Sequence, residues 1–280
     1  MIRFTAENGT PICEAVLRGV GVYLDNDSLI EIAKGPESRR QSFIDAIVIT
    51  GALLFSFTNS IEVAGPQGRS ADAVRALLDS IGPHWIPLEM NPYNVIRRER
   101  AGISPDRSAV SEAFMTAYFQ RRAFDLSPNG SKILDLSDSF FRLGAVLDWA
   151  HENRDGIRSD ADQIDQAVKD RIDATRADFD KDNAALDREI PPVVFDASRP
   201  ATFAHFHLLR TMVLEAKSHQ FKPHDGLDLC HAVLGSAFGS VATLDKHWKR
   251  RVEALPQPNG LARIFYRPQV DDLVSVLQKL

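Results

Sequence analysis

Carboxylates are the residues of this sequence whose types and spacing could do chemistry, and the richest stretch is residues 224–248. Asp225 and Asp228 stand at the start of an apolar helical pattern, where exposed N–H groups and the helix dipole favour negative charge. Residues 241–244 then form a predicted strand, with Asp245 at its carboxyl end. Open α/β sheets hold ligands at that end of their strands. This stretch therefore predicts a site for metal chemistry.

Two further segments place acids in similar positions. A brief predicted strand over residues 20–24 stops at Asp25. Glu62 follows the apolar segment 53–58, which periodicity alone leaves as strand or buried helix and which its polar stop favours as a strand. We expect Glu62 in the first turn of a short helix after that strand. Each acid taken singly could merely cap a helix or end a strand. Taken together, they predict a metal centre formed by Asp25, Glu62, Asp228 and Asp245.

The ligand chemistry favours a hard cation. Carboxylates that gather within a few ångströms repel one another unless a cation compensates their charge. Oxygen ligands suit Mg²⁺ or Mn²⁺, whereas the sequence has no Cys/His set with the spacing of a zinc site. Asp27 either adds a ligand or caps the following helix, a role for which Ser28 is the other candidate. His231 lies three residues after Asp228 on the same helix face, so we expect it to orient Asp228 rather than bind metal.

Basic and aromatic residues follow Asp245 directly. We predict that they bind substrate by neutralising phosphate and by stacking on a base. The residues concerned are Lys246, Trp248, Lys249 and Arg250, with Arg251 next to them. The alternative is a solvated helix face with Trp248 packed inward.

The remaining pattern predicts an α/β fold with a small parallel sheet flanked by helices. Strands are expected at residues 20–24, 53–58, 85–90, 241–244 and 263–266, and residues 11–19 are expected to begin a helix. From residue 91 long helical patterns take over, at 108–123, 137–153, 159–189 and 201–219. We therefore predict a discontinuous domain, 1–90 and 220–280, interrupted by a large helical insertion, 91–219.

Composition restricts the setting of the protein. The chain has 280 residues and a net charge of −5, so it has no overall attraction to nucleic acid or to an anionic membrane. It has two cysteines, Cys13 and Cys230, both in patterns that predict helices, which favours a reducing cytoplasm over a disulfide framework. No signal-peptide core or segment of membrane-spanning length is present in the sequence.

The order of four short motifs resembles the acidic signature of the PIN-domain nucleases. The motifs are YLDND, SIEVAG, DLCHA and ATLDKHW, within residues 20–90 and 224–280. The resemblance implies a metal-dependent endoribonuclease whose four metal-binding acids are those named above. It also implies RNA as partner, products with a 5′-phosphate and a 3′-hydroxyl, and an inhibitor or partner protein as a further candidate partner. Asp27 departs from the family, which often has a small polar residue there, and the separation of Glu62 from Asp228 is longer than in compact members.

Two other functions remain open at this point. One is a non-catalytic PIN-like scaffold or protein-binding module, with the helical segment as its partner surface. The other is a nuclease that acts on structured DNA, since related metal sites serve both substrates.

Overall fold

A five-stranded parallel sheet is the centre of the computed structural model, which describes residues 2–7, 10–15, 19–64, 68–126, 142–215, 222 and 224–280. Every neighbouring pair in the sheet is parallel. The strands lie in the order β5 (Trp85–Leu88), β4 (Gly51–Ser56), β3 (Val20–Tyr23), β6 (Val241–Thr243) and β7 (Arg263–Phe265). The predicted α/β class with a small parallel sheet is confirmed, and each predicted strand coincides with one of these five.

Alternating side chains explain why these segments form strands buried on both faces. On β4, Leu53 and Phe55 join the hydrophobic core on one side of the sheet, while Leu54 joins the core on the other. On β3, Val22 and Tyr23 divide in the same way. Near-continuous apolar strands are typical of a parallel sheet covered on both faces. The ambiguous segment 53–58 is therefore a strand up to Ser56.

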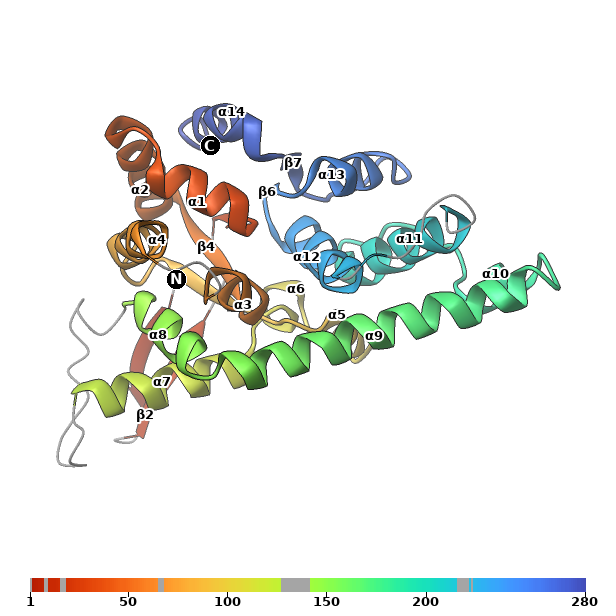
Figure 1. Ribbon diagram of the computed structural model, residues 1–280, viewed down its shortest axis with the longest axis horizontal. Helices are drawn as coiled ribbons and strands as arrows, with labels where there is room; N and C mark the ends of the chain where they lie inside the picture. Colours follow the sequence, from red (N-terminus) through yellow and green to blue (C-terminus); the bar gives the residue numbers. More distant parts are fainter. Residues whose placement is uncertain are drawn as a thin grey trace.

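Helices cover both faces of the sheet (Figure 1). The first core contains residues of α1 (Asn26–Lys34), α2 (Glu37–Thr50), α4 (Arg69–Ser80), α7 (Glu112–Leu126), α8 (Gly144–Glu152) and α14 (Val270–Leu277). The second contains residues of α5 (Pro92–Arg100), α9 (Arg154–Phe179), α10 (Ala185–Glu189), α11 (Pro200–Glu215), α12 (Asp225–Phe238) and α13 (Lys246–Glu253). The remaining helices are α3 (Phe57–Ala64), α6 (Pro105–Ser108) and the 3₁₀ turn η2 (Arg267–Gln269).

The predicted helical character of residues 91–219 is confirmed over the described part of that segment. Figure 1 shows α9 as one long helix that runs past α3 and ends near α10. Ile172 of α9 and Leu208 of α11 lie in the same core as Val233 of α12. Residues 127–141 and 216–221 lie outside the described residues, including parts of the helices predicted for 137–153 and 201–219. The division into a discontinuous domain and an insertion stays a prediction.

The expected helix over residues 11–19 is wrong for its first part. Residues up to Ala15 belong to β2 (Thr10–Ala15), which pairs antiparallel with β1 (Ile2–Glu7), and residues 16–18 lie outside the described part. Strand pairing overrides a helical pattern in this segment, because β structure depends on its neighbours more than on the local sequence. Cys13 accordingly lies in a strand, whereas Cys230 lies buried in α12 as expected.

Among the described residues, none of the helices combines the length and the apolar character needed to cross a bilayer.

Candidate functional site

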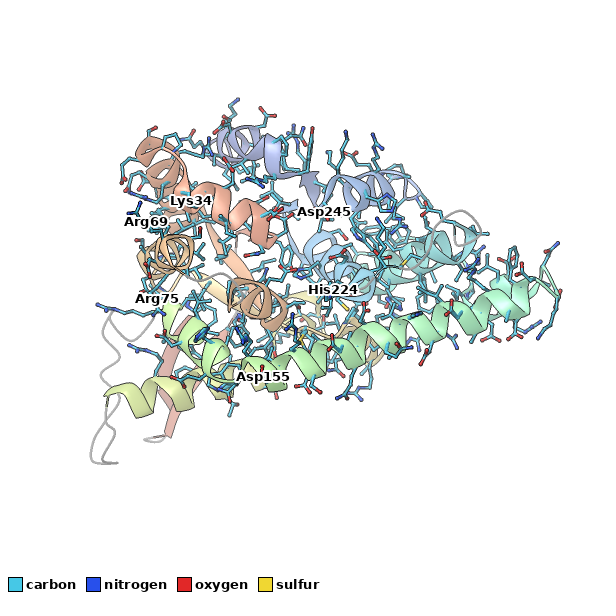
Figure 2. All side chains as sticks on the ribbon, viewed as in Figure 1. Lys34, Arg69, Arg75, Asp155, His224 and Asp245 are labelled. Carbon is cyan, nitrogen blue, oxygen red and sulfur yellow. The ribbon has the colours of Figure 1, made fainter. Side chains whose placement is uncertain are left out.

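The predicted acids line one cleft at the carboxyl edge of the sheet. The cleft has a volume of about 350 Å³. In Figure 2, Asp245 lies beside the end of α1 that follows β3. The residues that line the cleft are Asp25, Asn26, Asp27, Glu62, Asp228, His231, Leu244, Asp245 and Trp248. The structure thus brings together all five predicted metal ligands and His231.

The strand order explains how distant segments meet there. β3 and β6 are neighbours at the middle of the sheet, but the chain passes from β3 to β4 on one side and from β6 to β7 on the other. The connections that leave these two strands therefore diverge, which opens a crevice at their carboxyl ends. Asp25 stands two residues after the end of β3, and Asp245 stands two residues after the end of β6. The sheet therefore positions both acids without any contact between their local sequences.

Asp25 is fixed from both sides. Its Oδ1 accepts a hydrogen bond from the Ser28 N–H at 2.9 Å and another from the Thr243 hydroxyl of β6 at 3.0 Å. Its own N–H donates to Thr243 Oγ1 at 2.8 Å. Burial raises the pKa of Asp25, and the hydrogen bonds from Ser28 and Thr243 offset that only in part. The expected cap, Asp27 or Ser28, is wrong, because Asp25 caps α1; Asp27 lies exposed at the cleft.

Glu62 lies in the second turn of α3 rather than in its first, because the helix begins directly after β4 at Phe57. Its Oε1 lies 3.4 Å from Nε2 of His231. Burial favours the neutral acid, but the facing imidazole and the Asn26 N–H outweigh this and lower the pKa of Glu62. We expected His231 to orient Asp228. The structure instead places the imidazole ring against Glu62.

Asp228 stands in the first turn of α12. Burial raises the pKa of this carboxyl to about 6, opposed by His231 and reinforced by the negative charges of Glu62 and Asp245. The Trp248 indole, which lines the same cleft, lowers this pKa slightly. An ionised Asp228 is therefore unfavourable in this cleft unless positive charge enters, which is the electrostatic pattern of a ligand site.

A close approach between α9 and α12 fixes the start of α12. The N–H of Gly226 donates to Oδ1 of Asp165 at 2.8 Å, and a Cβ at this glycine would lie 2.8 Å from the Asp165 Cα. We expect Gly226→Ala to lower the free energy of unfolding by about 1–3 kcal/mol, because one of the two helices must shift. Urea denaturation measures this. Gly156→Ala in α9 is the control: its Cβ would meet no atom within 4 Å, so equal losses in both variants would contradict the prediction.

The basic segment after Asp245 is only partly available to a ligand. Trp248 is 3% exposed, so the alternative in which it packs inward is correct and a freely stacking ring is not. Lys249 is also held, because its Nζ donates to the Ile264 carbonyl at 2.6 Å and pairs with Glu253. Lys246 and Arg250 remain exposed and form no ion pair with a described residue.

Arg251, at the end of the same segment, packs against the indole ring of Trp248. The guanidinium lies 4.5 Å from the indole ring centroid and pairs with Glu215 at 2.6 Å. The side chain is buried, so this cation is part of the packing around the cleft and not a contact for phosphate. Trp248 is therefore packed against Arg251 and lines the cleft together with Asp228.

Two polar residues near the strand ends also shape the site, and the sequence did not predict their role. Thr243 is the last residue of β6 and clamps Asp25. Asn59 joins the ends of two strands: its amide donates to the Leu24 carbonyl at 2.9 Å, and its Oδ1 accepts the Ser56 N–H at 2.9 Å. Both stand where a predicted strand stops. Their position was therefore the available signal, although their residue types alone suggest turns.

The donor atoms of the cleft suit a hard cation. They are carboxylate oxygens, and the amide oxygen of Asn26 is buried without a hydrogen-bond partner among the described residues. The side chains do not converge on one point, since no three of the described His, Cys, Asp and Glu residues stand close enough to enclose an ion. The chemistry of the residues fits Mg²⁺ or Mn²⁺, whereas a formed ligand shell is not shown.

Comparisons with known proteins add no identification. Neither protein-family models, nor curated proteins, nor solved structures give a match to this chain. The resemblance to the PIN-domain nucleases therefore stays a prediction that depends on the four motifs.

Proposed function

We propose that this protein is a PIN-like, metal-dependent endonuclease that hydrolyses phosphodiester bonds of RNA with Mg²⁺ or Mn²⁺ bound in the acidic cleft. One observation supports this most strongly: acids from four separate segments of the chain line the same cleft at the switch point of a parallel sheet. That edge is where α/β proteins hold ligands. A packing role explains neither the gathering of these acids nor the half-buried positions of Asp25, Glu62 and Asp228.

In this proposal the metal ligands are Asp25, Glu62, Asp228 and Asp245, and the exposed carboxylate of Asp27 completes the set. A bound cation would polarise the phosphate and lower the pKa of an attacking water. The protein supplies orientation. Thr243 and Ser28 hold Asp25 through hydrogen bonds. None of the acids need act as a nucleophile; as ionised carboxylates they would hold the cation.

Substrate attraction is assigned to Lys246 and Arg250. Both are exposed; Lys246 begins α13 directly after Asp245, and Arg250 lies in the last turn of that helix. With a net charge of −5 the chain as a whole repels nucleic acid, so binding must depend on local cations such as these. Such cations would contact the phosphate backbone, which positions a nucleic acid without reading its base sequence.

Metal removal tests the proposal. We expect the purified protein to cleave a labelled single-stranded RNA, to lose that activity in EDTA, and to regain it when Mn²⁺ or Mg²⁺ is added in excess. Gel analysis of the products, with a structured DNA of similar length as competitor, measures cleavage and substrate choice together. Cleavage that continues unchanged in EDTA would refute a metal-dependent reaction. If the protein cleaves only the DNA, and does so only with metal, it is instead a nuclease that acts on structured DNA.

A further inference from the structure

A line of polar contacts runs from the interior of the sheet to the cleft. The Tyr23 hydroxyl of β3 is hydrogen-bonded to Nδ1 of His231, and Nε2 of the same ring faces the Glu62 carboxylate at 3.4 Å. Tyr23 is 1% exposed and His231 5% exposed. Only the last two residues of this line reach the cleft wall. Tyr23 therefore touches neither solvent nor a ligand.

The fold makes specific room for the tyrosine. Gly235 lies one turn after His231 on the same face of α12, and a Cβ there would lie 2.6 Å from Cδ1 of Tyr23. The Tyr23 and His231 rings lie 5.7 Å apart between centroids. The absence of a side chain at residue 235 thus lets the tyrosine ring lie against the helix, with its hydroxyl directed at His231.

The hydrogen bond at Nδ1 holds the imidazole ring with Nε2 facing Glu62. Nε2 carries a proton both in the imidazolium form and in the neutral ring whose Nδ1 accepts the Tyr23 hydroxyl. The N–H at Nε2 then points toward the Glu62 carboxylate. An imidazole held in this way cannot offer a lone pair to a cation at the Glu62 side, and it restricts the rotation of the acid it faces.

We propose that Tyr23 and His231 are positioning residues that hold Glu62 for the cation, and that His231 is not itself a ligand. This inference rests on the proposed function, because it concerns the metal that the cleft would bind. The residues act in series: Tyr23 sets the orientation of the imidazole, and the imidazole sets the orientation of Glu62. Removal of either one should therefore have the same effect as removal of both.

The test is Mn²⁺ affinity, measured by titration calorimetry on the full chain, with the RNA cleavage rate beside it. Tyr23→Phe and His231→Gln should each weaken Mn²⁺ binding about tenfold or more, as loss of such outer partners does. The double variant should bind no more weakly than His231→Gln alone. Tyr118→Phe and His205→Gln remove the same groups at buried positions outside the cleft, and both should leave Mn²⁺ affinity unchanged.

A second cycle shows whether the effect passes through Glu62. In a Glu62→Gln background, His231→Gln should change Mn²⁺ affinity by less than twofold. Circular dichroism checks that each variant is folded. If His231→Gln does not fold, Tyr23→Phe carries the test, because it keeps the aromatic ring of residue 23 and removes only the hydroxyl. If the wild-type protein binds Mn²⁺ and both variants bind it equally well, the inference is wrong and the proposed function stands. If the wild type neither binds Mn²⁺ nor cleaves RNA, both fall.

Discussion

Asp228→Asn is expected to make the metal-free protein more stable above pH 6 while it removes RNA cleavage. The pKa of Asp228 is raised from 3.8 to about 6 in the folded protein. A raised pKa means that the folded state holds the proton more tightly than the unfolded chain does. The wild type therefore loses stability as pH rises from 3.8 and has lost all of this contribution above about 6. Asparagine cannot ionise, so the variant avoids that loss.

The size of the effect follows from the shift. One pKa unit corresponds to about 1.4 kcal/mol, so the variant should gain up to about 3 kcal/mol at neutral pH and nothing below pH 4. Urea denaturation in EDTA at several pH values measures the difference. Asp272→Asn, at an exposed position in the first turn of α14, is the control and should change stability by about 0.5 kcal/mol or less. A variant that is less stable than the wild type at pH 7 would contradict the prediction.

The loss of activity in the same variant has a separate cause. An amide carries no charge, so it holds a divalent cation far more weakly than a carboxylate does. We expect the cleavage rate to fall by about 100-fold or more. Gain of stability together with loss of activity is the pattern of a residue retained for function at the expense of the fold. Unchanged cleavage by Asp228→Asn would remove this acid from the proposed site.

Glu99→Ala is expected to destabilise the protein by about 3–5 kcal/mol. The Glu99 side chain of α5 is 1% exposed and accepts hydrogen bonds from the N–H groups of Ala201 and Thr202 at 2.9 and 2.8 Å. It also accepts the Thr202 hydroxyl at 2.6 Å. These donors are at the start of α11, so Glu99 caps that helix from another part of the chain. Alanine would leave the donors without partners and open a cavity between α5 and α11.

Thermal unfolding followed by circular dichroism measures this loss. Glu99→Gln is the matched variant, because its amide keeps one acceptor oxygen but places a donor opposite a donor; it should cost less than alanine. Glu253→Ala, at a half-exposed surface pair with Lys249, should cost about 1 kcal/mol at most. Equal stability of Glu99→Ala and Glu253→Ala would contradict the assigned cap.

The carboxyl edge of the sheet could be predicted because two local signals coincide there. Apolar strands end at residues that are acidic, and parallel strands bring their ends to one edge, so Asp25 and Asp245 could be placed together from the sequence. Asp228 followed from the preference of helix starts for acids. The gathering of these acids depends on topology, and the topology follows from which segments are strands.

The contacts between these side chains could not be predicted in the same way. His231 shares a helix face with Asp228, yet it contacts Glu62 because α3 packs closely enough to bring that acid to the ring. Trp248 has an aromatic face suited to a base, but burial next to Arg251 decides its role. Spacing along a helix defines neighbours on that helix only. Contacts with residues on other helices depend on how the helices pack, and this packing cannot be read from the sequence alone.

The position of β6 between β3 and β7 has a consequence for synthesis of the protein. A ribosome that has translated the first two hundred or so residues has produced β3, β4 and β5 but neither β6 nor the acids at 228 and 245. The incomplete chain leaves one edge of β3 without a strand partner and lacks half of the cleft. A chain that ends before residue 228 therefore lacks two of the four acids proposed as metal ligands, and its open β3 edge is a site at which other chains can pair and aggregate.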